Sequence, residues 1–310
     1  MKRLISVLLA AALAVSATAC SGGEGASSAV SSEDSGSQAV SSEENAAVSS
    51  ASPVTGSITA SGSSALYPLV QDAIKKFKQN NPDASISLNA GGSGTGLKQV
   101  AEGSVDIGNS DVEAESKLDA DQAAMLIDHR VCVITMAPVV SPDVAETVTS
   151  LTTQQLIDIF TAKTTNWKDV GGPDEAIALV TRPSTSGTRA LFKEYALGSS
   201  EEASNASLET DDSGTLLQNV ASHDGAIGYV ALSYLINNTS VKTVAIDGVE
   251  PTLENTYNGT YKVWGYEHMY TKGEATGLAK ALIDFMQSDE YAEAVETLGY
   301  NVTSKMTVSR

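Results

Sequence analysis

Apolar residues recur at helical spacing in some stretches of this chain and form short continuous runs in others. In the stretch 64–79, Leu66, Leu69 and Phe77 share one face of a helical projection, which predicts an amphipathic helix. Strands are predicted at 57–60, 85–88 and 105–108, and a second helix at 95–102. This alternation is typical of α/β folds with a parallel sheet, whose ligands gather at the carboxyl ends of the strands.

A second alternating region follows a long apolar strand predicted at 129–140. Its predicted elements are helices at 153–160, 188–197 and near 215–222, and strands at 176–181 and 226–230. Another long strand is predicted at 261–270, with helices at 275–287 and 290–298 after it. We interpret this last part as a return to the first region. Two crossing strands then join lobe I (55–135 plus 262–310) to lobe II (136–261).

The N-terminus has the pattern of a secretory signal. Lys2 and Arg3 precede an apolar run at 4–15, which is shorter than the roughly 20 residues needed to span a bilayer. We assign 1–19 to a removable signal peptide and expect an extracytoplasmic protein.

Cleavage before Cys20 would leave an N-terminal cysteine, and the small residues at 17–19 resemble the lipobox of bacterial lipoproteins. We therefore expect acyl chains such as palmitate on Cys20 and an anchor on the outer face of the cell membrane. Ala17 and Ala19 also fit the A-x-A rule of ordinary signal peptidase, so free secretion stays open.

Residues 20–54 have the composition of an acidic, Ser-rich, disordered tether. Between 21 and 52 the chain contains neither a basic nor an aromatic residue, so this part cannot bury a core. The roughly 257 residues that follow are enough for two lobes. Cys132, the only other cysteine, lies in an apolar run, so we expect a buried thiol and no disulfide.

The net charge limits the partners of the chain. There are 19 basic and 38 acidic residues, a formal net charge of −19. Such a chain repels polyanions at long range, so we expect no nucleic-acid partner. A small anion can still bind where local N–H groups and an arginine outweigh distant charges, which salt screens within roughly 10 Å.

Three Ser/Gly/Thr segments lie where predicted helices begin, at 61–68, 91–96 and 181–189. A helix start offers unpaired N–H groups and a partial positive charge, and small hydroxyl residues let a tetrahedral oxyanion approach closely. Taken singly, each segment is more typical of an N-cap or a turn. Because all three fall at strand-to-helix junctions of one chain, together they favour a cage for phosphate.

The candidate donors of this cage are Ser64, Ala65, Ser93, Ser186, Gly187 and Thr188. Arg182, four residues before Ser186, is placed to fork its guanidinium onto two phosphate oxygens, although alone it is more typical of a surface ion pair. Asp111 follows the third predicted strand, where a carboxylate repels an anion unless it accepts a proton from it. Sulfate has no proton to give at neutral pH, so Asp111 favours phosphate.

Several segments resemble the ligand loops of the phosphate-binding subunit of bacterial phosphate ABC importers. They are 61–69, 92–99, 106–111 and 182–188, and the similarity extends to 156–172 and 225–229 and covers about 58–301. It implies a type II periplasmic-binding-protein fold, in which two α/β lobes close on one phosphate in the cleft between them. It also implies high-affinity binding of inorganic phosphate and its delivery to ABC permease subunits with a cytoplasmic ATPase.

By position, the ligands of this family fall on Ser64, Ala65, Ser93, Asp111, Arg182, Ser186, Gly187 and Thr188. The chain departs from many relatives in the third loop. Ser184 replaces an acidic residue that orients the arginine, and Thr185 replaces a common glycine. The resemblance therefore leaves open how Arg182 is held.

Other functions remain as alternatives. A phosphatase or serine hydrolase is disfavoured, because Ser93 lacks G-x-S-x-G spacing and His129, His223 and His268 lie in no catalytic motif. No metal-ligand spacing is evident, so we expect neither an enzyme nor a metal or other cofactor. A binding protein for sulfate or molybdate, and a surface phosphate sensor or adhesin with the same fold, stay open. We expect a monomer.

Overall fold

The structure is a computed structural model that describes residues 53–203 and 207–310. The chain divides after Ser50, and the unit Ala51–Arg310 contains all the described residues. The predicted signal peptide, Cys20 and the tether up to residue 52 lie outside the described residues.

The strands of this unit include every strand that the apolar pattern predicts, together with short ones that it missed. They are β1 (Gly56–Gly62), β2 (Ala84–Ala90), β3 (Ile107–Ser110), β4 (Leu126–Val140), β5 (Ser150–Leu151), β6 (Ala178–Thr181), β7 (Ser207–Glu209), β8 (Ala226–Ala231), β9 (Lys242–Thr243), β10 (Ala245–Ile246) and β11 (Trp264–Lys272).

The strands of the main sheet follow the order β2-β1-β3-β11-β4-β8-β6-β7. β1 pairs in parallel with β2 and β3, which confirms the predicted parallel arrangement, and β6 is parallel to β7 and β8. β11 is antiparallel to both β3 and β4. The fold is therefore α/β, as predicted.

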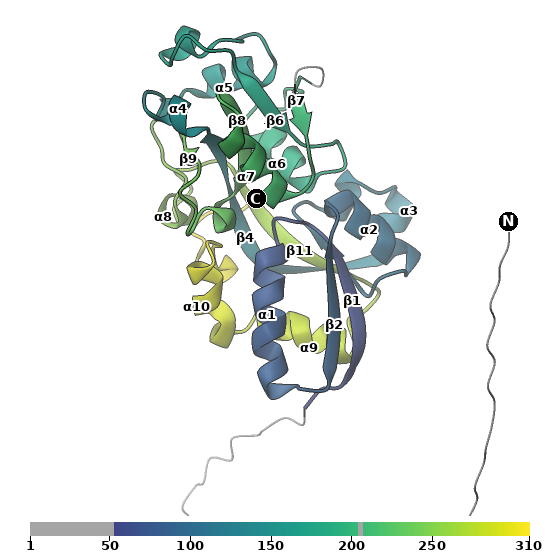
Figure 1. Ribbon diagram of the computed structural model, residues 1–310. Coiled ribbons are helices and arrows are strands. Elements are labelled where there is room, and N and C mark those ends of the chain that lie inside the picture. The colour runs from purple at the N-terminus through teal and green to yellow at the C-terminus, as the bar shows by residue number, and fades with distance from the viewer. Residues whose placement is uncertain (1–52, 204–206) are drawn as a thin grey trace, which may run out of the picture. The chain divides into compact units, whose positions relative to one another are not determined.

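β4 is long enough to pair with two different partners. Its residues 126–135 pair with β11, and its residues 136–140 pair with β8. We call β2, β1, β3, β11 and 126–135, with their helices and loops, the first sheet region. The second sheet region is 136–140 with β8, β6 and β7 and their helices and loops. Figure 1 shows β4 and β11 side by side between the two groups of helices.

The helices include every helix that the 3.6-residue periodicity predicts, with ends that differ by a few residues. They are α1 (Tyr67–Asn80), α2 (Ser93–Glu102), α3 (Ala120–Ala123), α4 (Pro142–Ala145), α5 (Thr153–Phe160), α6 (Gly187–Tyr195), α7 (Ser213–Ser222), α8 (Leu253–Tyr257), α9 (Gly277–Met286) and α10 (Asp289–Thr297). Short 3₁₀ turns are η1 (Ala114–Ser116), η2 (Trp167–Val170), η3 (Leu232–Tyr234) and η4 (Thr303–Lys305).

Separate apolar cores hold the helices on the sheet. Leu69 of α1 and Leu282 of α9 share a core with Ile58 of β1, whereas Leu97 of α2 packs with Tyr270 of β11 in another core. Cys132 is fully buried and free, as predicted. Burying side chains of this size stabilises the fold by about 1.5–3 kcal/mol each.

Two predicted boundaries are wrong in a way that matters for the site. α1 begins at Tyr67 rather than at 64, because Pro68 occupies the first turn and Leu66 is the N-cap, so Ser64 lies in the loop before the helix. α2 begins at Ser93 rather than at 95, after Gly92, whose φ of 83° ends the preceding loop.

Candidate functional site

The residues predicted from the helix-start segments are buried together. None of the polar side chains among them is more than 4% exposed: Ser64, Ser93, Asp111, Arg182, Ser186 and Thr188. Ala65 and Gly187 are buried as well. Residues 64–111 belong to the first sheet region and residues 182–188 to the second. The structure therefore brings the predicted set together from both regions.

Asp111 connects three of the predicted segments through its carboxylate and its backbone N–H. It accepts a hydrogen bond from the Ser63 hydroxyl and one from Thr188 Oγ1 at 2.7 Å. The backbone N–H of Asp111 donates to Ser93 Oγ at 3.0 Å. Thr188 comes from the second sheet region, so this carboxylate joins the two regions where β3 ends.

Arg182 follows β6 and is completely buried. Its Nη1 donates to the carbonyl of Asp211 at 3.1 Å, and its Nη2 donates to Ser213 Oγ at 3.0 Å and to the carbonyl of Tyr229 at 3.4 Å. Nε has no hydrogen-bond partner among the described residues. A buried donor of this kind costs about 1–3 kcal/mol when unpaired, so it favours an anionic ligand.

Further contacts cross between the two sheet regions around this cluster. The N–H of Gly94 donates to the carbonyl of Thr185 at 3.1 Å, and the hydroxyl of Tyr234 donates to the carbonyl of Ser64 at 2.7 Å. Lys117 Nζ donates to the carbonyl of Ser184 at 2.8 Å and to that of Ser186 at 3.1 Å. Burial lowers the pKa of Lys117, although Asp111 and Asp211 oppose the shift.

The start of α7 was missed by the sequence reasoning. Ser213 is fully buried there and lies 3.1 Å from Ser64 Oγ, which also donates to the carbonyl of Asp211 at 2.9 Å. A signal was present in the chain: the triplet Ser-Gly-Thr occurs at 93–95 and 186–188, and again at 213–215. The third copy begins a helix beside the other two.

The carboxylate of Asp211 occupies the space over the α-carbon of Gly92. A Cβ at position 92 would overlap Oδ2 of Asp211 and lie 2.8 Å from its Cγ, so only glycine fits. Burial raises the pKa of Asp211, whereas a hydrogen bond from Ser186 and the charge of Arg182 lower it. The segment 211–213 thus holds Arg182 in a chain that lacks an acidic residue at 184.

Comparisons with known proteins agree with this geometry. A family model for the PBP superfamily domain matches residues 47–290. The phosphate-binding protein PstS of Bacillus subtilis is 49% identical over 257 residues, which are 83% of this chain and 84% of that protein. This chain belongs to the PBP superfamily and to the PstS family within it.

Solved structures of similar proteins extend the family likeness to the fold. A crystal structure with bound phosphate, of a Clostridium perfringens protein described as a phosphate ABC transporter substrate-binding protein, is 34% identical with a TM-score of 0.73. The matched region covers 79% of this chain and 99% of the Clostridium perfringens chain. An ABC-type phosphate transport receptor from Vibrio cholerae is 26% identical with a TM-score of 0.62, over 79% and 99% of the two chains.

In this PstS-family chain the buried cluster combines hydroxyl donors, the free Nε of Arg182 and the carboxylate of Asp111. The N-termini of α2 and α6 add partial positive charge. Such an array complements a small oxyanion that carries a proton, because the Asp111 carboxylate can accept a further hydrogen bond and Arg182 Nε lacks an acceptor.

The described residues include no group of His, Cys, Asp and Glu placed to hold a metal ion. No helix within 53–203 or 207–310 is long and apolar enough to cross a membrane.

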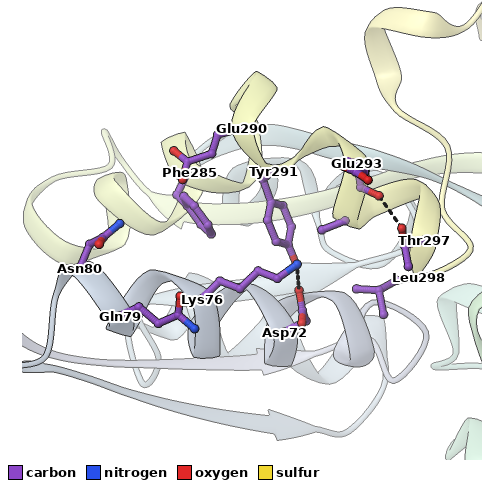
Figure 2. Close-up of a pocket in the computed structure, with 11 residues that line it drawn as sticks. Asp72, Lys76, Gln79, Asn80, Phe285, Glu290, Tyr291, Glu293, Thr297 and Leu298 are labelled. Atoms are coloured by element: carbon purple, nitrogen blue, oxygen red, sulfur yellow. Dashed lines mark hydrogen bonds and ion pairs between the residues drawn. The ribbon is translucent and has the colours of Figure 1, made fainter. Parts of the chain in front are cut away.

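A separate pocket lies between α1 and the helices α9 and α10, away from the buried cluster. Figure 2 shows Lys76 and Tyr291 both directed at Asp72 in this pocket. Lys76 Nζ is 3.1 Å from Asp72 Oδ2, and Tyr291 Oη donates to the same oxygen at 3.0 Å. These groups already satisfy one another, so nothing in this pocket requires a ligand.

Proposed function

We propose that this protein binds inorganic phosphate with high affinity outside the cytoplasm and delivers it to the permease of an ABC transporter. The observation that favours this function most is the buried pair of Arg182, with its unpaired Nε, and Asp111, with its hydroxyl partners. Membership of the PstS family supports the same conclusion.

Each predicted residue has a proposed role in the site. Arg182 binds phosphate oxygens, and the Asp111 carboxylate accepts a hydrogen bond from the protonated oxygen of the phosphate. The remaining members donate hydroxyl or backbone hydrogen bonds: Ser64, Ala65, Ser93, Ser186, Gly187 and Thr188. Because sulfate has no proton for Asp111 at neutral pH, we expect the site to reject it.

We also propose that the chain works as two lobes that close on the ligand. Lobe I comprises 55–135 and 262–310, and lobe II comprises 136–261. Support comes from β4, which changes its partner from β11 to β8 between 135 and 136. Hydrogen bonds across the site, such as that from Thr188 to Asp111, can form only when the lobes are together.

For the N-terminal part we propose a signal peptide at 1–19, a lipid on Cys20 and an acidic tether at 20–54. The mature protein would then be a monomer on the outer face of the membrane, without catalytic activity or cofactor. Mass spectrometry of the N-terminal peptide from membrane fractions tests the lipid. An unmodified N-terminus at Cys20 or Ser21 in the culture medium would favour free secretion.

Calorimetric titration tests the proposed ligand. We suggest residues 21–310, partially unfolded and dialysed to strip bound ligand, titrated with phosphate, sulfate and molybdate. We expect tight one-to-one binding of phosphate alone. Tighter binding of sulfate or molybdate would keep the fold and overturn the ligand, and no oxyanion binding would favour an adhesin or enzyme.

The variant Asp111→Asn tests discrimination in the same titration. The amide of asparagine has one acceptor oxygen instead of two and carries no charge. Phosphate binding should therefore weaken by about 10- to 100-fold, which corresponds to the loss of one hydrogen bond to a charged group. Sulfate binding should improve, because the repelling charge is gone. An unchanged ratio of the two affinities would place discrimination elsewhere.

A further inference from the structure

A fully buried carboxyl group lies directly behind the candidate site. Glu267 of β11 has no exposed surface, and neither of its carboxyl oxygens has a hydrogen-bond partner among the described residues. An ionised carboxylate in this position would be a buried, unpaired charge, which is strongly destabilising. Glu267 therefore needs either a cation or a proton.

The sheet places Glu267 next to Asp111. In the antiparallel pair of β11 and β3, His268 is opposite Ser110 and Met269 is opposite Asn109. Continuing this register by one residue sets Glu267 opposite Asp111. Cross-strand neighbours have their Cβ atoms about 4.5–5.5 Å apart, so a change of side-chain rotamer can bring the carboxyl groups of Glu267 and Asp111 into hydrogen-bond contact.

The surroundings of Glu267 favour its protonated form. Burial, followed by the charge of Asp111, raises the pKa of Glu267 well above its usual range. Two other titratable groups facing it are the thiol of Cys132 on β4 and the phenol of Tyr300, whose pKa values burial also raises. His268 is the next residue of β11, but its Nδ1 lies 2.8 Å from Asp128. We find no cation against Glu267 among these groups.

We propose that Glu267 is a positioning residue for the proposed phosphate site: its protonated carboxyl donates a hydrogen bond to Asp111 and orients that carboxylate toward the proton of the ligand. A carboxylate has about four lone-pair sites. Ser63 and Thr188 occupy two of them, and the proposed hydrogen bond from Glu267 takes a third, which leaves one for the hydroxyl of a phosphate. This inference rests on the proposed function and adds a residue to it.

The role depends on a proton, so it predicts a distinctive pH dependence. When Glu267 ionises, it loses its only donor and places a second negative charge beside Asp111. Phosphate binding by the wild type should then weaken at alkaline pH. The matched variant Glu267→Gln keeps a donor at every pH and has nearly the same volume, so its binding should not show this loss.

The test compares the wild type, Glu267→Gln and Glu267→Met, as residues 21–310, by titration with phosphate and sulfate between pH 6 and 10. At pH 7 the wild type and Glu267→Gln should agree within about threefold, and Glu267→Met should bind phosphate about tenfold more weakly. Toward pH 10 the ratio of the wild-type to the Gln affinity should fall. Ionisation of phosphate itself cancels in that ratio.

An infrared difference spectrum between the wild type and Glu267→Gln gives an independent readout of the proton. We expect a band of a protonated carboxylic acid that is absent from the Gln variant. A flat affinity ratio together with no such band would overturn the inference while leaving phosphate binding intact. No phosphate binding by the wild type would overturn the proposed function, and the inference with it.

Discussion

Gly187, the first residue of α6, is a position where the two sheet regions approach very closely at the site. A Cβ at this position would overlap Ser93 Oγ and lie 2.7 Å from Ser93 Cβ and 3.1 Å from Asp111 Cβ. Both neighbours belong to the first sheet region. The substitution Gly187→Ala therefore places a methyl group between the regions, and in proposed open lobes it would meet neither residue.

The expected loss of phosphate affinity in Gly187→Ala follows from the size of this overlap. Ordinary contact begins near 3.4 Å, so a Cβ at 2.7 Å from Ser93 Cβ requires a shift of at least about 0.7 Å, the difference between the two distances, and the overlap with Ser93 Oγ adds to it. Ser93 cannot move freely, because it is fully buried and accepts the N–H of Asp111 at 3.0 Å. Overpacking of this kind costs about 1–3 kcal/mol, which corresponds to roughly 5- to 150-fold weaker phosphate binding.

Calorimetric titration with phosphate measures the loss, and thermal unfolding without phosphate shows whether folding is affected. Because the overlap arises only between closed lobes, Gly187→Ala should keep the wild-type melting temperature or raise it slightly, since Ala favours a helix over Gly. The stabilisation that phosphate adds should shrink in proportion to the lost affinity.

Gly214→Ala is the matched control. Gly214 occupies the middle of the third Ser-Gly-Thr triplet, at the start of α7, and a Cβ there would meet only Asp212 Oδ1 at 3.4 Å. We expect its phosphate affinity to stay within about threefold of the wild type. Wild-type affinity in Gly187→Ala, or an equal loss in both variants, would refute the reasoning that closure brings Gly187 against Ser93.

Three further predictions concern folding, closure and pH. A Cβ on Gly96 would lie 2.5 Å from a carbonyl oxygen of its own sheet region, so Gly96→Ala should lower the melting temperature by about 2–10 °C. Gly91→Ala is the control, because a Cβ on Gly91 would meet its nearest atom at 3.5 Å, and it should leave the melting temperature unchanged. Lys117→Met removes two hydrogen bonds across the site and should weaken phosphate binding about 3- to 10-fold, mainly by faster dissociation. Burial raises the pKa of Glu202, a hydrogen-bond acceptor of Tyr229, to about 7. The unfolded carboxyl loses its proton near 4.5, so stability should fall between pH 4.5 and 7 by at most about 3 kcal/mol, and Glu202→Gln should remove this fall.

Each of these has a contrary outcome. Equal melting temperatures for Gly96→Ala and Gly91→Ala would mean that the loop at 96 can relax. Unchanged dissociation of phosphate from Lys117→Met, in stopped-flow measurements, would show that the lysine contacts do not stabilise the closed form. Parallel curves of unfolding free energy against pH, from urea denaturation of wild type and Glu202→Gln, would show that Glu202 is ionised in the folded protein at pH 5.

The local elements could be predicted because their signals are local. The helix predicted at 153–160 matches α5 residue for residue, since Thr152 and Gln155 form a capping box before an apolar stripe. The Ser/Gly/Thr segments predict an anion site by residue type together with their position at strand-to-helix junctions. In the structure Arg182, Ser186 and Thr188 are buried, and Thr188 donates a hydrogen bond to Asp111.

The contacts that complete the site were decided by the tertiary structure. Glu267 lies beside Asp111 only through the antiparallel register of β11 on β3, and the segment at 211–213 reaches Arg182 only through the packing of α7. No local pattern distinguishes Lys117 from other charged residues, and only the structure shows that it donates to carbonyls of the second sheet region. Propensity and periodicity act over a few residues, whereas strand order and register depend on burying whole faces at once. For that reason the sequence predicts which residues belong to the candidate site, whereas only the folded sheet determines which of these residues contact one another.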